Sequence, residues 1–142
     1  MEYRLVPSTF WVSNQHDGGS GSLRQAVLDA NARPGADTIA FRNSAVGTIT
    51  LTSGELLITG DVRIDGPGAD RSAVSAGNIS RVLEIAAGAN VTIEDLKIIN
   101  GSVTGANGGA ILNAGTLTLS DSVVSGSTAA RVAGGTIGGQ GG

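Results

Sequence analysis

The chain has 142 residues, which is enough for one domain of ordinary size. Hydrophobic residues make up 40% and charged residues 15%, so the composition is not that of a disordered polyelectrolyte, and 23 glycines disfavour a helical bundle. The net charge of −3 excludes the basic surface that a nucleic-acid binder needs. The lack of Cys excludes disulfides and thiolate metal sites, and no apolar run approaches the roughly 18 residues of a membrane-spanning helix.

The front of the chain has a mixed composition and holds all the aromatic residues: Tyr3, Phe10, Trp11 and Phe41. Its beginning, MEYRLVPSTF, lacks the apolar core of a signal peptide, so we expect no signal peptide in this chain. We expect Trp11 to pack in the core, because an aromatic residue beside a helix serves there more often than as a ligand anchor.

An amphipathic helix is predicted over residues 22–31. Ser22 and Gln25 form an S-x-x-Q capping box, in which the two side chains would reciprocally satisfy backbone N–H groups at the helix start. Apolar residues then follow at helical spacing: Leu23, Ala26, Val27 and Ala30. Pro34 forbids continuation of the helix. With strands predicted over residues 10–12 and 38–41, this segment is expected to cap the apolar end of the next part of the chain.

The rest of the chain contains an internal repeat of about 26 residues. The segments and residues that align at this offset are 91–95 with 117–121, 108–116 with 134–142, Ile85 with Ile111, and Ile98 with Val124. One unit earlier, 62–66 aligns with 91–95 at an offset of about 29, as if a loop had gained three residues. Such a period is typical of solenoid proteins, in which each unit stacks on the one before it.

Within each unit, apolar residues alternate with polar or small ones. The alternating pairs are Ile49 and Leu51, Val62 and Ile64, Val91 and Ile93, and Leu117 and Leu119. A period of two predicts short strands, here separated by Gly, Asn, Ser or Asp. We therefore predict an all-β right-handed parallel β-helix, or β-solenoid, of about four coils. Its N-terminal cap would span residues 1–46, and its coils of about 26 residues each would span 47–142.

Three stretches carry a resemblance to a known family. The run from Trp11 to Phe41, including DGGSGSLRQAVLDAN, resembles the N-terminal cap of bacterial right-handed parallel β-helix proteins found in planctomycetes and cyanobacteria. Residues 47–70 (GTITLTSGELLITGDVRIDGPGAD) resemble their first coils, and residues 108–113 (GGAILN) resemble the repeat of the polymorphic outer-membrane proteins. The resemblance covers nearly the whole chain, but the last unit, GGTIGGQGG, lacks the usual Asn and large apolar residues. It implies a cell-surface or secreted parent protein.

Charged residues that could support polysaccharide cleavage lie on the predicted coils. They are Asp61, Arg63, Asp65, Asp70, Arg71, Arg81, Glu84, Glu94, Asp95 and Lys97. Coil stacking would bring Arg63 near the Thr92 and Thr118 positions, and Glu84 is a further neighbour. We interpret the set as a solvated coil surface with ion pairs between coils, and Asp65 and Asp95 as turn residues. No aromatic residue follows Phe41, so the coils lack a platform for stacking sugar rings.

Other motifs do not indicate a catalytic, cofactor or metal site. GGTIGGQGG has no Asp to bind Ca²⁺. GPGADRS lacks the Lys of a phosphate-binding loop, so we predict that it forms a turn. The single His, His16, is expected on the surface. Threonines at Thr50 and Thr92 could belong to a ladder of the kind used to bind ice, but Arg63 would interrupt it.

The sequence therefore predicts a non-catalytic, structural or adhesive module at the cell surface or outside the cell, with no catalytic residue, cofactor or metal. The predicted partner is a second copy of the chain, joined through the coils from Gly108 to Gly142, because a solenoid without a C-terminal cap leaves strand edges unpaired. A surface polysaccharide or a protein is a further candidate ligand. The alternative is a fragment of a carbohydrate-active β-helix enzyme, a polysaccharide lyase or hydrolase.

Overall fold

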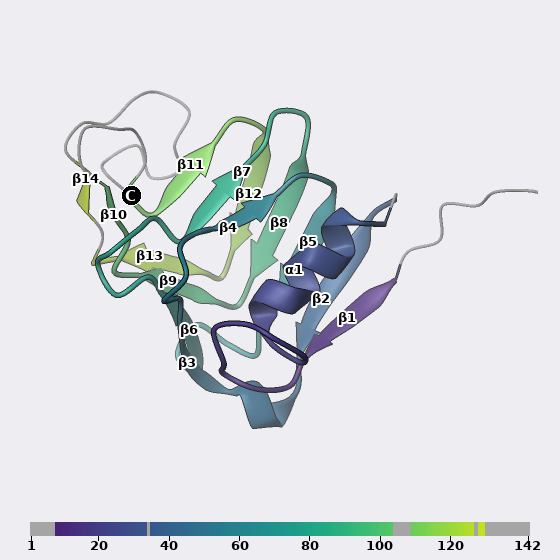
Figure 1. Ribbon diagram of the computed structural model, residues 1–142, viewed down its shortest axis with the longest axis horizontal. Coiled ribbons are helices and arrows are strands. Elements are labelled where there is room, and N and C mark those ends of the chain that lie inside the picture. The colour runs from purple at the N-terminus through teal and green to yellow at the C-terminus, as the bar shows by residue number, and fades with distance from the viewer. Residues whose placement is uncertain (1–7, 34, 104–108, 127, 130–142) are drawn as a thin grey trace, which may run out of the picture.

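The computed structural model describes residues 8–33, 35–103, 109–126 and 128–129. In these residues the chain is mostly β, with parallel sheets and one α-helix (Figure 1). The first sheet contains β1 (Thr9–Val12), β2 (Asp37–Phe41), β5 (Val62–Asp65), β8 (Asn90–Glu94) and β12 (Thr116–Ser120). The second contains β3 (Gly47–Thr50), β6 (Ser72–Ser75), β9 (Lys97–Ile99) and β13 (Val123–Ser125). The third contains β4 (Leu56–Ile58), β7 (Leu83–Ile85) and β11 (Ile111–Asn113).

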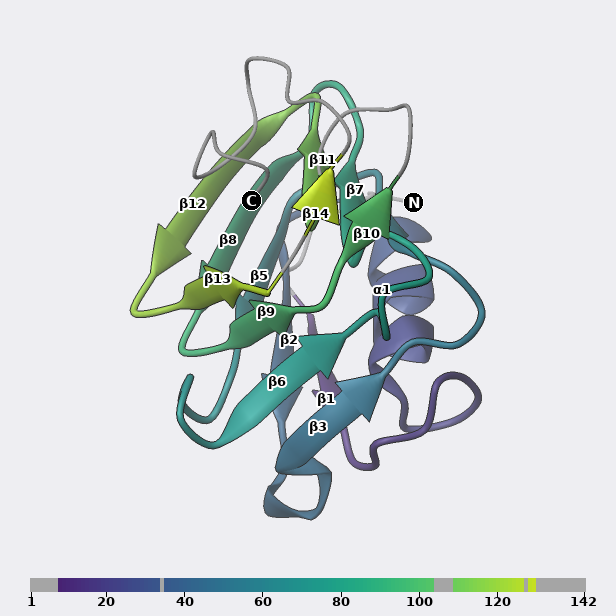
Figure 2. The same ribbon diagram turned by 90° about the vertical axis from the view of Figure 1, so that its left-hand side faces the viewer.

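From β2 onward, the chain visits the three sheets in a fixed order, and each strand pairs in parallel with the strand one round earlier. Two shorter strands, β10 (Ser102–Val103) and β14 (Thr128–Ala129), form an additional parallel pair. The 3₁₀ turn η1 (Asn43–Ala45) links β2 to β3. Figure 2 shows the second sheet facing the viewer, with the first and third sheets on either side of it.

The predicted register is confirmed in the first and second sheets. Leu117 pairs with Val91, and Val124 pairs with Ile98. Val62 pairs with Val91, as the longer offset predicts. The predicted match of Ile85 with Ile111 is wrong, because Ile111 pairs with Leu83 and Ile85 pairs with Asn113. The segment from β9 to β11 is longer than the one from β6 to β7. Paired residues of β7 and β11 are therefore 28 residues apart, two more than the 26 that separate paired residues of β8 and β12. The predicted match of residues 108–116 with 134–142 lies outside the described residues.

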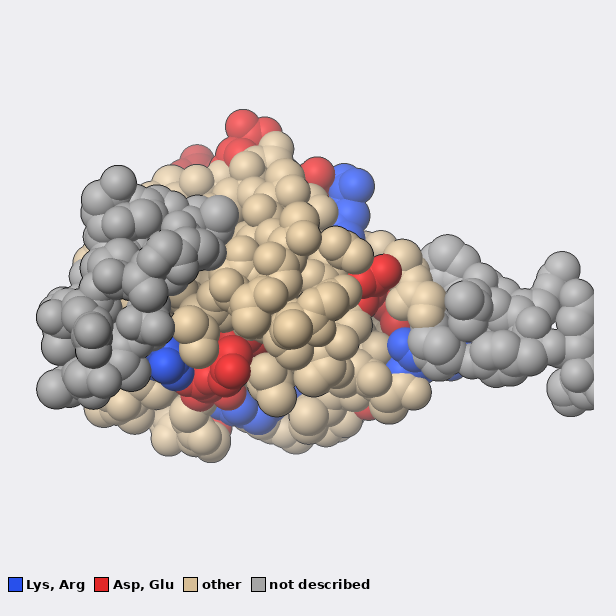
Figure 3. All heavy atoms as spheres, turned by 90° about the horizontal axis from the view of Figure 1, so that it is seen from above, with Lys and Arg blue, Asp and Glu red and all other residues tan. Residues whose placement is uncertain are grey.

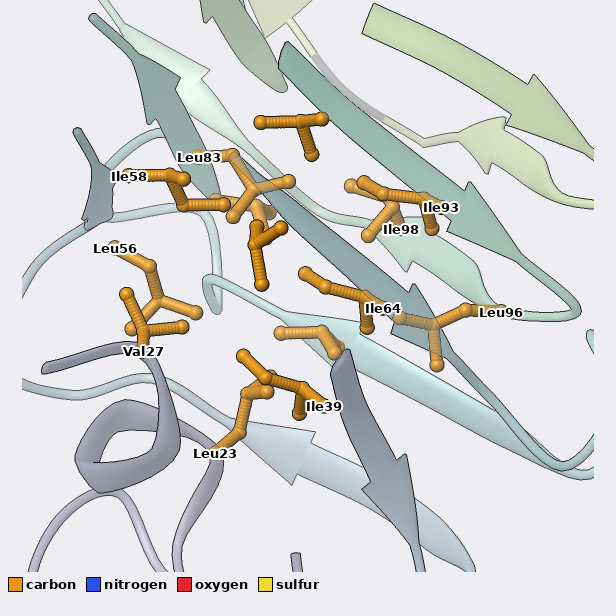
Figure 4. Close-up of a cluster of buried hydrophobic side chains, with 14 of the residues drawn as sticks. Leu23, Val27, Ile39, Leu56, Ile58, Ile64, Leu83, Ile93, Leu96 and Ile98 are labelled. Atoms are coloured by element: carbon orange, nitrogen blue, oxygen red, sulfur yellow. The ribbon is translucent and has the colours of Figure 1, made fainter. Parts of the chain in front are cut away.

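Apolar side chains from the three sheets meet in one core (Figure 4). In the first sheet, Ile39, Ile64 and Ile93 occupy equivalent positions on successive strands and are fully buried. Each buried aliphatic side chain of this size contributes about 2 kcal/mol to folding through the hydrophobic effect. Because side chains alternate along a strand, the residues on either side of these isoleucines in the first sheet face outward.

The helix α1 (Leu23–Asn31) forms where it was predicted. Its buried residues are Leu23, Ala26, Val27 and Ala30, and it packs against β1, β2 and β4. The Ser22 hydroxyl accepts a hydrogen bond from the Gln25 N–H, but the expected reciprocal half of the capping box is not formed. The Gln25 amide instead donates to Asp29, and the Ser22 N–H donates to the carbonyl of Gly19.

Candidate functional site

The outward face of the first sheet carries a shallow groove. Its register aligns Thr38, Arg63 and Thr92 on β2, β5 and β8, with their side chains facing away from the core. The groove has a volume of about 380 Å³, within the size range of small-molecule sites. Its lining residues are Ala36, Asp37, Thr38, Asp61, Val62, Arg63, Asn90 and Thr92.

Polar groups in this groove are partly engaged with one another. The Asp61 carboxylate accepts hydrogen bonds from both the backbone N–H and the side-chain amide of Asn90, at 3.0 and 3.2 Å. Arg63 forms an ion pair with Glu94 on the neighbouring strand, at 2.6 Å. This pair is one of the ion pairs between successive rounds that the sequence predicts. The pair offsets the positive charge of Arg63, so the groove presents mainly hydrogen-bond acceptors.

A buried carboxyl group, Asp37, lies at the edge of this groove. The residue is 1% exposed and occupies an inward position on β2. One of its oxygens accepts a hydrogen bond from the Ser8 N–H, while Oδ2 is buried with no hydrogen-bond partner. The residue was not among the sequence candidates, although its position has the same alternation as Ile39 and Phe41. An Asp at an inward position of a strand was the signal that could have identified it.

Trp11 lies on the outward face of the same sheet. The expectation that it packs in the core is wrong, because the residue is 46% exposed. Alternation in β1 buries Val12 and turns Trp11 outward, and the register places Trp11 beside Ala40. The guanidinium of Arg42 lies 4.4 Å from the centre of its ring, in a cation–π contact. The structure thus adds an aromatic side chain to a surface where the sequence showed none.

Three further acidic residues gather at the other end of β5 and β8. Carboxylate oxygens of Asp65, Glu94 and Asp95 lie within 4.8 Å of one another, and all three residues are partly exposed. Asp95 has a positive φ of 57°, as expected of a turn residue, whereas Asp65 is the last residue of β5 rather than part of a turn. Such a cluster is able to attract a cation, but the ion pair of Glu94 with Arg63 already offsets part of its charge.

Glu84 lies on the third sheet, away from the groove, so the sequence candidates do not form one site. The pKa of Glu84 is raised by a hydrogen bond with Glu55, by burial and by the charge of Glu55, and Arg81 opposes this shift. Arg81 is paired with Glu55 at 2.8 Å, and the hydrogen bond between the two carboxyl groups favours a proton on Glu84.

The remaining sequence candidates line a smaller hollow beside β3 and β6. Asp70, Arg71 and Lys97 contribute to it, together with Thr48 and Ser72, and its volume is about 130 Å³. Residues 66–72 form a turn as predicted, with the N–H groups of Arg71 and Ser72 donating to the carbonyl of Gly68. Acidic and basic side chains lie next to one another on the face shown in Figure 3.

Two smaller predictions have definite outcomes. His16 is exposed, as expected. The expected line from Thr50 through Arg63 to Thr92 is wrong, because Thr50 belongs to β3 of the second sheet. In the first sheet, Arg63 instead stands between Thr38 and Thr92.

Comparison with family models, with curated proteins and with solved structures finds no match. Among the described residues, no helix has the length and apolar character needed to cross a membrane. The function therefore has to be argued from the surface and the strand edges of this molecule.

Proposed function

We propose that this chain is the N-terminal cap and first coils of a right-handed parallel β-helix, acting as a non-catalytic structural or adhesive module of a cell-surface or secreted protein. Its partner is a second copy of itself, bound through the coils from Gly108 to Gly142. The fixed order of the three sheets and the stacked register support the fold. The resemblance of the segment from Trp11 to Phe41 to β-helix caps supports the location.

One observation carries the proposed self-association. Leu117, Leu119 and Val124 occupy the same register positions as Val91, Ile93 and Ile98. The three earlier residues are 2%, 0% and 1% exposed, but their later equivalents are only partly buried. Within the described part of the chain, β11, β12 and β13 each have a hydrogen-bonded neighbour on one side only. A second copy added at these edges would bury the apolar side chains and extend the sheets by pairing with β11 and β12.

Sedimentation velocity at micromolar concentration tests this proposal. The wild-type chain should sediment as a dimer or larger species. Thr118→Lys places a charge on the exposed outer face of β12 without touching the core, and it should shift the population towards monomer. Thr48→Lys is the matched control, because Thr48 is an exposed residue on β3, at the opposite end of its sheet. A wild-type chain that stays monomeric, or equal effects of the two variants, would contradict the proposal.

The carboxylates beside Arg63 favour a second candidate, a polysaccharide lyase or hydrolase, because such enzymes use clustered carboxylates with a basic neighbour. Assays on acidic and neutral polysaccharides test it. Turnover that disappears in Asp65→Ala, with the fold retained by circular dichroism, would establish the enzyme and overturn the non-catalytic proposal.

A further inference from the structure

On the outer face of the first sheet, short side chains of β2 lie between larger side chains from β1 and β5. Ala40 and Thr38 face outward from β2 and have short side chains. Trp11 stands beside Ala40 on β1, and Arg63 pairs with Thr38 on the other side, from β5. The register places Trp11 level with Ala40 and Asp65, whereas Thr38 and Arg63 lie two residues nearer the strand starts. The indole is therefore one strand spacing (~4.8 Å) across and ~7 Å along from Thr38, the nearest groove residue, and Asp61 lies farther along the same face.

Much of the indole is open to solvent. The Arg42 guanidinium lies 4.4 Å from the ring centroid, and Trp11 is still 46% exposed. An aromatic side chain has few rotatable bonds, so it loses little entropy when a ligand binds, and its face provides a large apolar contact. The apolar C–H face of a pyranose ring matches such a surface.

The groove beside the indole provides the complementary polar groups. The Asp61 carboxylate accepts hydrogen bonds, and Asn90 and the hydroxyls of Thr38 and Thr92 can both accept and donate them. Arg63 is paired with Glu94, whereas Asp61 has no cationic partner within the described ranges. A ligand that donates hydroxyl hydrogens therefore fits this lining, and an anionic ligand would be repelled by Asp61 and Asp37.

We propose that this face binds a neutral oligosaccharide running obliquely across β2 and β5, with one sugar ring stacked on Trp11 and the hydroxyls of a ring several units along bonded in the groove around Asp61 and Asn90. This inference rests on the adhesive role proposed above and specifies the chemistry of its ligand. Acidic polysaccharides are excluded by the charge of the lining.

Tryptophan fluorescence gives a direct readout, because Trp11 is the only Trp in the chain. The probes are the hexasaccharides of cellulose, xylan, mannan and chitin, with hexagalacturonate as the acidic counterpart. We expect a saturable change in emission with at least one neutral hexasaccharide at millimolar concentration and none with hexagalacturonate. No change with any of the four neutral probes, or a preference for hexagalacturonate, would overturn the proposal.

Variants assign the binding to this face by calorimetry. Trp11→Ala should weaken binding by about tenfold, which corresponds to about 1.4 kcal/mol of lost stacking. Trp11→Phe should restore part of the affinity, and Asp61→Asn should weaken it. Leu57→Ala is the control, because Leu57 is 44% exposed on the third sheet. Affinity unchanged in Trp11→Ala would refute the site. Failure here with self-association intact refutes only this inference, since sedimentation measures the proposed function separately.

Discussion

Arg24 of α1 forms an ion pair with Asp17 at 3.0 Å and, with the same guanidinium, also donates to the carbonyls of Asp17, Gly54 and Glu55. The helix, the loop before it and the loop before β4 are thereby joined by one side chain. Asp17 completes the junction by accepting hydrogen bonds from the Thr52 N–H and the Ser53 hydroxyl. This network fixes α1 against the first strands of the sheets.

Replacing Arg24 by Lys should destabilise the protein by about 1–3 kcal/mol, because a single ammonium group cannot reach all the acceptors on two segments as the planar guanidinium does. Urea denaturation measures the difference. Arg33→Lys is the matched control, because Arg33 is exposed near the end of the same helix. Equal stability of the Arg24 and Arg33 variants would show that the network contributes nothing.

Asp17 should make the folded state sensitive to acid. Burial alone would raise its pKa, but the bonds from Ser53, Thr52 and Arg24 outweigh that effect and hold the pKa well below its usual value. A lowered pKa contributes stability above the unfolded-state pKa, and this stability is lost as the pH falls below about 4. Asp17→Asn should therefore lower the melting temperature at pH 7, with a smaller difference in acid. Asp70→Asn, at an exposed position, is the control and should leave the melting temperature at pH 7 nearly unchanged.

Glu84 should have the opposite effect. Its raised pKa means that the protonated form is favoured in the folded state, so its contribution to stability is present at low pH and lost as the pH rises through the raised pKa. Glu84→Gln keeps a hydrogen-bond donor towards Glu55 and removes the like charge. We expect a higher melting temperature than wild type at pH 7 and a smaller difference in acid. Glu94→Gln, which breaks the ion pair with Arg63, should not be stabilising. A lower melting temperature of Glu84→Gln at pH 7 would contradict this account.

Neighbouring residues on α1 test how the helix packs. Val27 is 2% exposed, whereas Leu28 is 53% exposed. Val27→Asp buries an unpaired carboxylate at a cost of several kcal/mol, comparable to the whole stability of a small domain. We expect loss of cooperative melting in Val27→Asp and a nearly unchanged transition in Leu28→Asp. A cooperative, unshifted transition in the Val27 variant would show that α1 does not cover the core.

A pair of glycines tests the close stacking of successive rounds. A Cβ at Gly66 would collide with the backbone carbonyl of Asp95, one round later, whereas a Cβ at Gly60 would meet nothing within 4 Å. Gly66→Ala should therefore destabilise by about 1–3 kcal/mol through overpacking. Gly60→Ala should change stability by less than about 0.5 kcal/mol. Chemical denaturation of both variants checks this difference, and similar values would mean that the rounds are not packed this closely.

Local patterns in the sequence determined the strands, the helix and much of the register. Alternation predicted that Ile64 and Ile93 point inward, and spacing predicted the buried face of α1, because both periods follow from backbone geometry alone. The offset of 26 residues placed Leu117 on Val91 correctly. The same offset failed for Ile111, because the register of the third sheet also depends on the length of the preceding loop.

The candidate site was decided by the tertiary structure. Trp11 and Arg63 are far apart in sequence, and only parallel pairing through β2 brings them to one outward face. Glu55 raises the pKa of Glu84 for the same reason, since the two residues come from successive rounds of the chain. The alternation within a strand determines which of its side chains share a face, but not which strand lies beside it. That neighbour is chosen by packing of the whole core and by loop lengths summed over a full round.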